Sequence, residues 1–378
     1  MGHFVTEEQQ HFVEEARRIA REKLLPLVDS APAGRVNRPL IKALAEYGLL
    51  PPLFPKHLGG SREGDVSAME LCLLREALAR ESTEAETALA MQGLGAYPIL
   101  QSGTDVVVKR WIPAIAQGEA VPAFALTEPE AGSDAAGVQL KAEVQGNGFR
   151  LTGVKTWISN APDADVYTVF ARTTPDARAR GVTAFVVPGN SDRVTGTALE
   201  LVAPHPVGRL ELDGVFVPRD HVLGEVDGGF RVAMNTLNLF RPSVGAFAVG
   251  MSWAALDAAT DHALYRQSFG KPLRDFQAVS HLLAEMATRT EAARLMVYSA
   301  ATAYDAGSPS VTKTSAMAKL FATETAQFVV DAAIQIHGAS GLERGHLLEH
   351  LYREVRAPRI YEGTSEIQRE IIARELYR

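Results

Sequence analysis

A carboxylate near the C-terminus occupies a position suited to acid–base chemistry. Glu362 lies between Tyr361 and Gly363, directly before a segment whose pattern predicts the start of a helix. Ser365 is expected to cap that helix, with Gln368 three residues later completing a capping box. Glu362 then belongs to a tight turn, and loop positions of this kind carry many catalytic groups. From the local sequence alone, an exposed carboxylate in a turn is the simpler interpretation.

Three further segments carry side chains suited to a flat, charged cofactor. The loop 125–137 offers small residues, two hydroxyl groups and backbone N–H groups, which suit ring oxygens and phosphates. Trp157 and Ser159 would share one face of a strand, where an indole can stack and a hydroxyl can hydrogen-bond. Residues 266–271, followed by 276–277, form a basic and aromatic cluster that can hold a pyrophosphate. Taken singly, a polar linker, a core tryptophan and a solvated turn are the ordinary alternatives.

The composition is that of a soluble globular protein, and it narrows the classes of partner. Hydrophobic residues make up 46% of the 378 residues and charged residues 22%. A formal net charge of −7 argues against affinity for nucleic acid or for anionic membranes. The single cysteine, Cys72, lies in an apolar run, so we expect a buried structural thiol and no internal disulfide. No metal site is predicted.

The N-terminus shows no targeting pattern. It lacks the basic region and apolar stretch of a secretory signal, and it is acidic too early for a transit peptide. No uninterrupted apolar run approaches the roughly 20 residues that span a bilayer. The sequence therefore predicts a soluble, cytoplasmic protein with no membrane partner.

The elements that must position these side chains follow the order α, then β, then α. Helical spacing dominates residues 1–120, a period closer to two appears in residues 121–227, and long helical patterns return in residues 228–378. We therefore expect an α+β, multi-domain fold with an N-terminal helical domain, a central β-barrel or sandwich and a C-terminal helical domain at these boundaries.

Several local signals predict where elements begin, turn and end. Capping boxes are expected at Thr6–Gln9 and Ser67–Glu70. Glycines and Pro98 are expected to interrupt the helical pattern that follows the second box. A hairpin turn is expected at Gly146–Gly148, and Ser308–Pro309 is expected to begin a helix with Ser308 as its cap.

In combination, these segments resemble the acyl-CoA dehydrogenase family over nearly the whole chain. The resemblance rests on Leu126–Pro129 with Gly132–Asp134, Trp157–Ser159, Arg266–Lys271, Gln335–Gly338 and Ile360–Thr364. It implies an N-terminal helical domain, a central β domain and a C-terminal four-helix domain. It also implies non-covalently bound FAD and a homotetramer arranged as a pair of dimers.

Matched position by position, the resemblance assigns residues to the FAD site. Along the flavin it places Phe124, Leu126, Thr127, Gly132 and Ser133, with Trp157 over the ring and Ser159 near its N5. It assigns contacts with the FAD of the neighbouring subunit to Arg266, Ser268, Phe269, Gln335, Gly338 and Ala339. Further cofactor contacts are implied at Phe276, Gln277, Thr364 and Glu366. A complete active site would then need at least a dimer.

The resemblance also implies the chemistry. Glu362 matches the catalytic base, which takes the proton α to the thioester carbonyl while the β hydrogen leaves as hydride to flavin N5. The backbone N–H of Glu362 and a ribityl hydroxyl of FAD would polarise the carbonyl. Desolvation is expected to raise the pKa of Glu362 towards the working pH. Some relatives carry the base at the position of Phe240, which cannot accept a proton. The implied substrate contacts are Ser133, Asn238, Arg241 and Gly363.

The sequence departs from the family pattern at three places. Ala339 stands where a second glycine is usual, and Asn238 stands where many relatives carry an aspartate. The segment Leu201–Leu210 is shorter than in typical relatives and lies in the part of the β domain that faces the substrate entrance in the family. The resemblance therefore implies CoA as the carrier of the acyl thioester less firmly than it implies FAD as the cofactor.

The leading hypothesis is an FAD-dependent α,β-dehydrogenase of an acyl-CoA thioester that passes electrons to an electron-transfer flavoprotein. One alternative is the same chemistry on a carrier-protein-bound acyl group in a biosynthetic pathway. Others are a flavin oxidase or monooxygenase, a relative that removes a sulfur group, and a DNA-associated, non-catalytic relative. The motif around Glu362 argues against the oxidase, and the net charge of −7 argues against binding DNA.

Overall fold

The computed structural model describes residues 5–377 and separates into two compact units. The helical unit combines Met1–Glu22, Ser67–Glu86 and Asn238–Arg378, and the sheet unit combines Lys23–Val66 and Thr87–Leu237. Each unit gathers separate stretches of the chain, because some N-terminal helices belong to one unit and some to the other. Compact packing therefore does not follow the three sequence blocks, whose boundaries stay a prediction.

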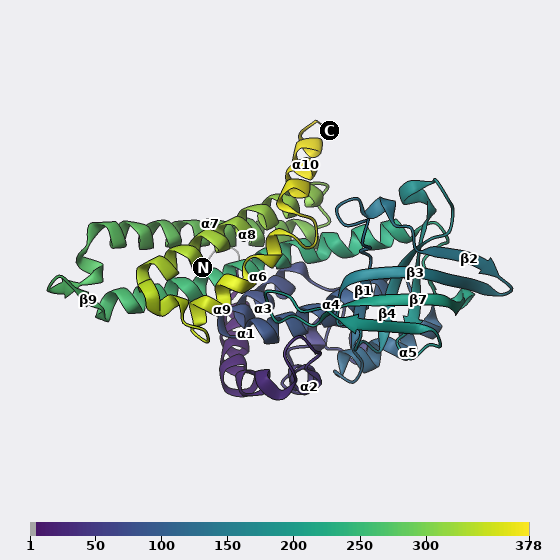
Figure 1. Cartoon of the computed structure of the whole chain (residues 1–378), viewed down its shortest axis with the longest axis horizontal. Coiled ribbons are helices and arrows are strands. Elements are labelled where there is room, and N and C mark those ends of the chain that lie inside the picture. Colours follow the sequence, from purple (N-terminus) through teal and green to yellow (C-terminus); the bar gives the residue numbers. More distant parts are fainter. Residues whose placement is uncertain (1–4, 378) are drawn as a thin grey trace. The chain divides into compact units, whose positions relative to one another are not determined.

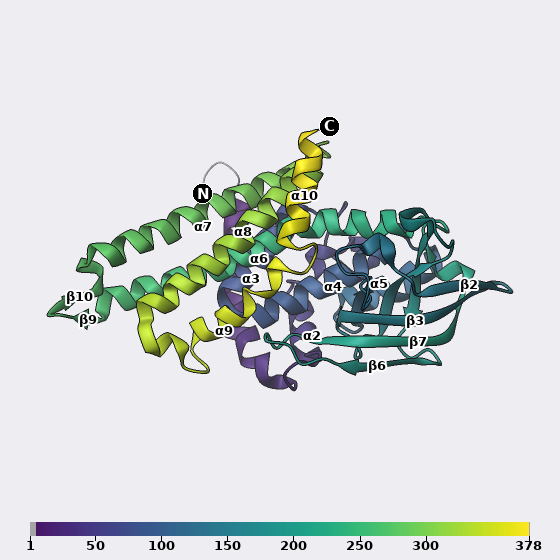
Figure 2. The same cartoon turned by 45° about the horizontal axis from the view of Figure 1, so that its top comes forward.

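An eight-stranded, mostly antiparallel sheet forms the centre of the sheet unit. Its strands are β1 Pro122–Ala125, β2 Lys141–Gln145, β3 Gly148–Ser159, β4 Val166–Arg172, β5 Val182–Pro188, β6 Val194–Ala198, β7 Val207–Pro218 and β8 Val222–Leu223. The order is β6-β7-β3-β2-β4-β5-β8, and β1 pairs with β4 in parallel. Figure 2 shows β6, β7 and β3 next to one another. The central β region predicted by the sequence is confirmed.

One face of the sheet packs on the core of its unit, and the strands β4 and β5 are buried on both faces. Phe149, Leu151, Tyr167 and Phe185 belong to this core, and each is almost completely buried. Buried and exposed residues alternate along most of β7, as expected for a strand with one face on the core. The turn between β2 and β3 consists of two residues and begins with Gly146 at φ +54°, which confirms the predicted hairpin.

In one helix of the sheet unit the structure corrects a prediction made from the sequence. The helices of this unit are α2 Arg38–Glu46, α5 Asp105–Ala116, the start of α6 Gly229–Tyr265 as far as Leu237, and the part of α4 Thr83–Ser102 that begins at Thr87. The prediction that glycines and Pro98 interrupt the last of these was wrong, because Pro98 lies inside the uninterrupted helix α4. Gly95 permits close packing on the strand region, since a Cβ there would lie 2.8 Å from Pro122 Cβ. Tertiary packing overrides the low helix propensity of these residues.

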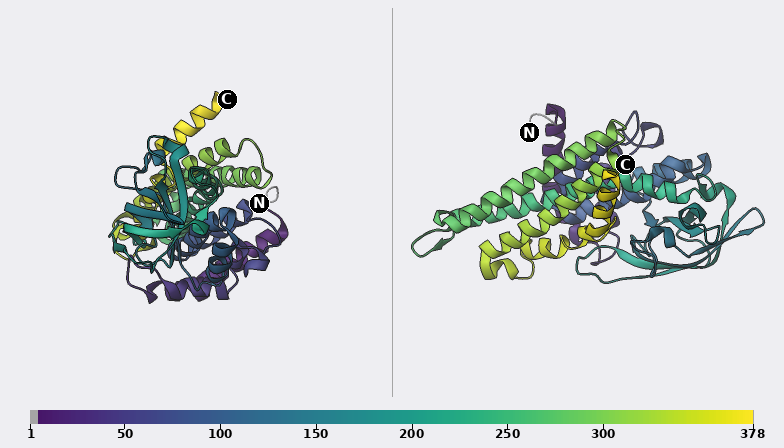
Figure 3. Two further views of the ribbon diagram at one scale, coloured as in Figure 1. Left: turned by 90° about the vertical axis from the view of Figure 1, so that its right-hand side faces the viewer. Right: turned by 90° about the horizontal axis from the view of Figure 1, so that it is seen from above.

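The helical unit is dominated by three long helices. Its helices are α1 Glu7–Ile19, α3 Ala68–Glu81, the start of α4, α6 Gly229–Tyr265 from Asn238 onward, α7 Gln277–Asp305, α8 Val311–His337, α9 Leu347–Glu354 and α10 Ser365–Leu376. A short hairpin of β9 Gln267–Ser268 and β10 Lys271–Pro272 joins α6 to α7. Figures 1 and 3 show α7 and α8 side by side along most of their length. The predicted N-terminal and C-terminal helical regions are confirmed.

Two of the predicted helix starts are confirmed and one is not. The Thr6 hydroxyl accepts from Gln9 N, completing the expected capping box, and the Ser67 hydroxyl accepts from Glu70 N. Helix α8, however, begins at Val311 rather than directly after Ser308. The Ser308 hydroxyl instead accepts from Ser310 N at 3.3 Å, so the serine closes a local turn before the helix.

Helix α10 is capped one residue earlier than predicted. The hydroxyl of Thr364, not Ser365, accepts the backbone N–H of the third helical residue, at 3.3 Å. Ser365 is the first helical residue, and its hydroxyl donates to Glu324 at 2.6 Å. The tertiary contact with Glu324 occupies the hydroxyl that local sequence reasoning had assigned to the cap.

Three further observations concern membrane-spanning helices, the single cysteine and metal-binding clusters. Within residues 5–377, every helix is too short or too polar to cross a bilayer. Cys72 is completely buried in α3, which confirms the predicted structural thiol, and burial raises the pKa of that thiol. In the same described range, no cluster of three or more His, Cys, Asp or Glu side chains is arranged to hold a metal ion.

Candidate active site

The turn around Glu362 is held by hydrogen bonds from two buried side chains of the helical unit. Glu362 adopts φ +52° and Gly363 adopts φ +92°, so two consecutive residues occupy the left-handed region. Lys319 Nζ donates to Gly363 O at 2.7 Å. Gln368 Nε2 donates to Glu362 O at 3.2 Å and to Gly363 O at 2.9 Å. A non-glycine residue persists in this conformation only where its surroundings enforce it, and such positions cluster at functional sites.

Glu362 is half-buried, and one oxygen of its carboxylate lies out of contact with solvent. That oxygen, Oε2, accepts no hydrogen bond from any of the described residues 5–377. Burial raises the pKa of Glu362, while the positive charges of Arg75, Lys319 and Arg241 act against that rise. Desolvation is the larger effect, so Glu362 is a stronger base than an exposed glutamate.

Arg75 on α3 belongs to a buried network inside the helical unit. Its Nε forms an ion pair with Glu86 Oε1, and its Nη1 donates to Ser243 Oγ at 2.7 Å. The exposed fractions of the Arg75 and Glu86 side chains are 2% and 0%. The pair therefore positions a guanidinium whose charge acts on Glu362, at the point where α3, α4 and α6 meet.

The two other cations come from α8 and α6. Lys319 is completely buried, and desolvation lowers the pKa of its ammonium to about 8. Arg241 is 6% exposed, its Nη1 donates to Asn238 Oδ1 at 3.2 Å, and its Nε is buried without a partner. A buried guanidinium N–H and a buried carboxylate oxygen thus both lack partners in this unit, as expected where polar groups await a ligand.

Sequence reasoning missed Arg75, Glu86, Lys319 and Gln368. A signal for two of them exists, since Arg75 and Lys319 lie on helix faces where the residues three and four positions away are small or apolar. A charged residue on a buried helix face must be paired or functional, because a lone buried charge is costly. Glu86 and Gln368 carry no comparable local signal.

In the sheet unit, the predicted flavin loop after β1 is attached to β3. Thr156 N donates to Thr127 O at 3.0 Å, and Lys155 Nζ donates to Leu126 O at 2.9 Å. This brings Leu126 and Thr127 close to the strand that carries Trp157 and Ser159. The register of β3 against β7 shifts between Lys155 and Ile158, and Trp157 adopts φ +53°. The bulge leaves Trp157 55% exposed, so it is not a core tryptophan.

The remaining residues of this group lie in the same loop or in β1 directly before it. Gly132 and Ser133 are exposed, and a Cβ built at Gly132 would meet no atom within 4 Å. Phe124 is half-buried, with its ring centroid 4.9 Å from that of Phe170. The loop therefore offers open space, hydroxyl groups and an exposed indole, which fit a flat cofactor with phosphates.

The cofactor residues predicted in the helical unit form separate groups. Arg266, Ser268 and Phe269 lie on or beside the β9–β10 hairpin, with Phe276 and Gln277 at the start of α7. Phe269 is 94% exposed, and its ring centroid lies 6.2 Å from that of Phe276. Gln335, Gly338 and Ala339 are exposed at the end of α8, and Thr364 and Glu366 begin α10. An exposed phenylalanine beside an exposed arginine fits a contact with a cofactor or another subunit.

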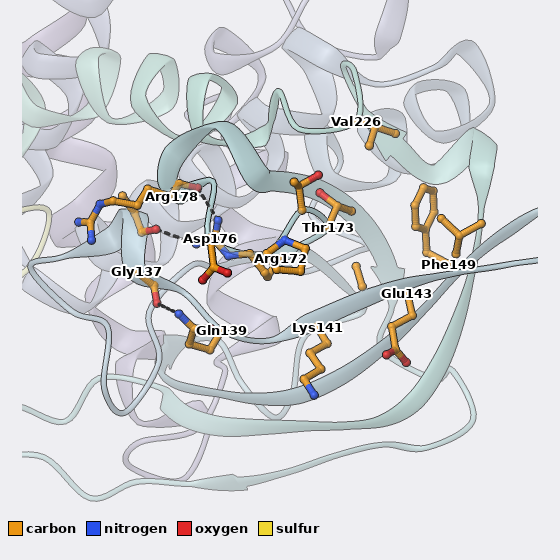
Figure 4. A pocket seen from close by; sticks show the side chains of 15 residues that line it. Gly137, Gln139, Lys141, Glu143, Phe149, Arg172, Thr173, Asp176, Arg178 and Val226 are labelled. Carbon is orange, nitrogen blue, oxygen red and sulfur yellow. Dashed lines mark hydrogen bonds between the residues drawn. The ribbon is translucent and has the colours of Figure 1, made fainter.

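A cavity in the sheet unit is lined by none of the residues assigned above to FAD or substrate, although Ala136 and Gly137 in its wall end the loop 125–137. It has a volume of about 790 Å³ and opens among residues of β2, β3 and the loop after β4. Figure 4 shows Lys141, Glu143, Asp176 and Arg178 around it. The Arg172 guanidinium in its wall donates to backbone carbonyls, including Ala136 O at 2.7 Å, so that group serves the loop structure.

Each of the three regions of the chain matches a domain of one known protein family. Residues 6–119, 123–215 and 227–377 match the N-terminal, middle and C-terminal domains of acyl-CoA dehydrogenase. The chain is 33% identical over 378 residues to cyclohexane-1-carbonyl-CoA dehydrogenase of Geobacter metallireducens, covering 99% of this chain and 98% of that protein. It is 37% identical over 349 residues to the caffeyl-CoA reductase-Etf complex subunit CarC of Acetobacterium woodii, covering 90% of each.

Solved structures show the same fold over the complete chain. Butyryl-CoA dehydrogenase from Megasphaera elsdenii superposes with a TM-score of 0.93 at 33% identity, covering 100% of both chains. The structure of PigA with FAD and proline superposes with a TM-score of 0.93 at 28% identity, covering 100% of this chain and 99% of that one. With matches to all three domains and similarity over nearly its whole length, the protein belongs to the acyl-CoA dehydrogenase family.

Proposed function

We propose that the protein catalyses the FAD-dependent α,β-dehydrogenation of an acyl-CoA thioester, with Glu362 as the catalytic base. The observation that carries the proposal is the Glu362 carboxylate, whose Oε2 is buried without a partner in a turn that other side chains enforce. A titratable group with a shifted pKa and a free, desolvated oxygen is the arrangement that proton abstraction needs.

The residues around Glu362 suit removal of a weakly acidic α proton. Burial raises the pKa of Glu362, which brings the base closer to the pKa that acid–base catalysis at neutral pH favours. Arg75, Lys319 and Arg241 limit that rise, which favours the ionised form that can accept a proton. The backbone N–H of Glu362 is proposed to donate to the thioester carbonyl, and Ser133, Asn238, Arg241 and Gly363 are proposed to contact the substrate.

FAD is the cofactor, and when bound it accepts the hydrogen that leaves the β carbon as hydride. In the sheet unit, Thr127 and Ser133 are proposed to hydrogen-bond the flavin and Trp157 to cover it, since the indole is exposed next to an open loop. In the helical unit, Arg266 and Phe269 are proposed to hold the FAD of a neighbouring subunit. This proposal is supported by the exposure of both residues, Phe269 in the β9–β10 hairpin and Arg266 directly before it.

The proposed partners follow from the same family. An acyl-CoA substrate is supported by the names of relatives that act on CoA thioesters. An electron-transfer flavoprotein is the proposed electron acceptor, and CarC, which is named as part of an Etf complex, supports it. A homotetramer or homodimer is proposed because predicted FAD residues lie on an exposed hairpin. A carrier-protein thioester is the second candidate, because Leu201–Leu210 is short and its residues before β7 form no strand.

An anaerobic titration of the purified protein tests the proposal. CoA thioesters of varied chain length are added first and carrier-protein thioesters second, while the visible absorbance of the flavin is followed. We expect a CoA thioester to bleach the flavin and Glu362→Gln to abolish bleaching while FAD remains bound. Glu370→Gln, an exposed carboxylate on α10, is the matched control and should bleach like the wild type.

Other outcomes of the titration would indicate a different substrate or a different reaction. If only carrier-bound substrates bleach the flavin, the acyl group is carried by a carrier protein and not by CoA. An unchanged flavin spectrum with every thioester, in protein that contains FAD, would reject dehydrogenation and favour an oxidase or another flavin reaction. Bleaching that survives in Glu362→Gln would reject Glu362 as the base.

A further inference from the structure

Lys319 is a buried cation that forms no ion pair with a carboxylate of the described residues 5–377. It lies on α8 between Ala318 and Leu320, and its side chain is completely inaccessible to solvent. Its only hydrogen bond among residues 5–377 is the one from Nζ to Gly363 O, at 2.7 Å. An ammonium has three N–H donors, and a buried ammonium without an ion pair is costly. A methionine would fill the same volume without that cost.

The position of Lys319 points to the turn that carries Glu362. Gly363 O accepts from Lys319 and from Gln368 Nε2, so one carbonyl holds two buried donors from α8 and α10. Gly363 has φ +92° and little conformational restraint of its own. The two donors therefore restrain the peptide between Gly363 and Thr364, and Gln368 also donates to Glu362 O, so the backbone on the C-terminal side of the carboxylate is fixed.

We propose that Lys319 is a positioning residue for the catalytic base: its ammonium anchors the Gly363 carbonyl and places a positive charge close to the Glu362 carboxylate. The inference rests on the proposed function, because it assigns Lys319 a role in proton removal by Glu362. It adds a residue that has no direct contact with FAD or substrate in the scheme above.

The charges around Lys319 come from every element packed on it. Glu362 in the turn, Glu324 on its own helix α8 and Glu366 on α10 favour its charged form, and Arg241 on α6 opposes it. Glu324 is already engaged by Arg359 at 2.9 Å and by the Ser365 hydroxyl at 2.6 Å. Arg75 on α3 and Arg241 are the other cations that act on Glu362. Removing Lys319 thus leaves two cations beside the base and leaves Gln368 Nε2 as the remaining donor to Gly363 O.

Two variants and a matched control test the inference in the FAD-loaded protein. Lys319→Met removes the donor and the charge, and Lys319→Gln removes the charge while keeping an N–H donor. Lys313→Met changes a partly exposed lysine on the same helix and should behave as the wild type. The measurements are the pH profile of kcat/KM with an acyl-CoA thioester and the exchange of the substrate's α proton in D2O. Flavin absorbance reports FAD loading for each variant.

We expect both Lys319 variants to shift the acid limb of the pH profile upward by about 1 unit, because a nearby positive charge lowers the pKa of a carboxyl. Lys319→Met should also exchange the α proton at least tenfold more slowly than Lys319→Gln at the pH where both bases are ionised. Because Lys319→Gln keeps a donor, it provides the test if Lys319→Met does not fold. A pH profile identical to that of the wild type in a loaded Lys319 variant would overturn the inference. Absence of exchange and bleaching in the wild type would instead reject the proposed function.

Discussion

Lys155 Nζ donates to Glu128 Oε1 at 2.7 Å, and the exposed fractions of the two side chains are 0% and 7%. Glu128 also accepts from Gln139 N at 2.6 Å and from Leu140 N at 3.0 Å, and Lys155 donates to Leu126 O. The buried pair therefore connects β3 to both ends of the loop in which we propose flavin contacts. Desolvation lowers the pKa of Lys155 to about 8, although Glu128 favours its charged form.

Breaking this pair should destabilise the protein. Lys155→Met leaves the Glu128 carboxylate buried without its cation, and such a change costs about 3–5 kcal/mol of unfolding free energy. The double variant Lys155→Met with Glu128→Gln should lose less than the single variant, because no unpaired charge remains. Thermal unfolding of the apoprotein measures both, with the exposed Lys141→Met as control. Equal losses in the single and double variants would contradict the prediction.

The pH dependence of stability should reveal the desolvation of Glu362. A carboxyl whose pKa is raised in the folded state stabilises the fold most below the usual pKa of 4.5, and this contribution is lost as pH rises through the raised pKa. Glu362→Gln removes the cost of burying the ionised form. We expect Glu362→Gln to unfold at a higher temperature than the wild type at neutral pH and to lose that advantage below pH 4.5. The same advantage at every pH would show that ionisation of Glu362 is not its cause.

The exposed indole of Trp157 gives a prediction about cofactor affinity. Because Trp157 is 55% exposed, Trp157→Ala should change the stability of the apoprotein little. Loss of the proposed stacking should raise the Kd for FAD by about 2- to 10-fold, the range of one aromatic pair. Fluorescence titration of the apoprotein with FAD measures this. Trp111→Ala, at a buried position of the same unit, should show the reverse pattern, with a large loss of stability. Unchanged FAD affinity in Trp157→Ala would remove Trp157 from the site.

Gly363 permits a conformation and a contact that alanine would disturb. A Cβ at this position would lie 2.6 Å from Gln368 Nε2, and the residue has φ +92°. Gly363→Ala should therefore lower activity by moving Gln368 or the turn. Gly345→Ala is a matched control, because Gly345 has φ +90° but no atom within 4 Å of the added Cβ. Steady-state kinetics and thermal unfolding of both variants separate the contact from the backbone strain. Equal activity losses would contradict the role of the Gln368 contact.

Helix caps and hairpin turns are predicted correctly from the sequence where the side chain that forms them has no competing partner elsewhere in the fold. The Thr6 cap and the hairpin at Gly146 are examples, since a hydroxyl three residues from an N–H, or a glycine in a two-residue turn, needs no distant partner. The cap of α10 was predicted one residue late because Glu324 engages the Ser365 hydroxyl. Helix α4 continues through Pro98 because packing in its unit outweighs local propensity.

The amino-acid sequence by itself determined the α, β, α order, the family resemblance and the candidate base, because hydrophobic periodicity and short motifs are properties of neighbouring residues. The assignments to FAD and substrate remain predictions of that resemblance. Only the tertiary structure decided that Arg75, Arg241 and Lys319, from three separate helices, act on Glu362. It also decided that Glu362 Oε2 is desolvated without a partner. Burial and electrostatic coupling depend on distance in space, and no local pattern in the sequence encodes which helices meet at the turn.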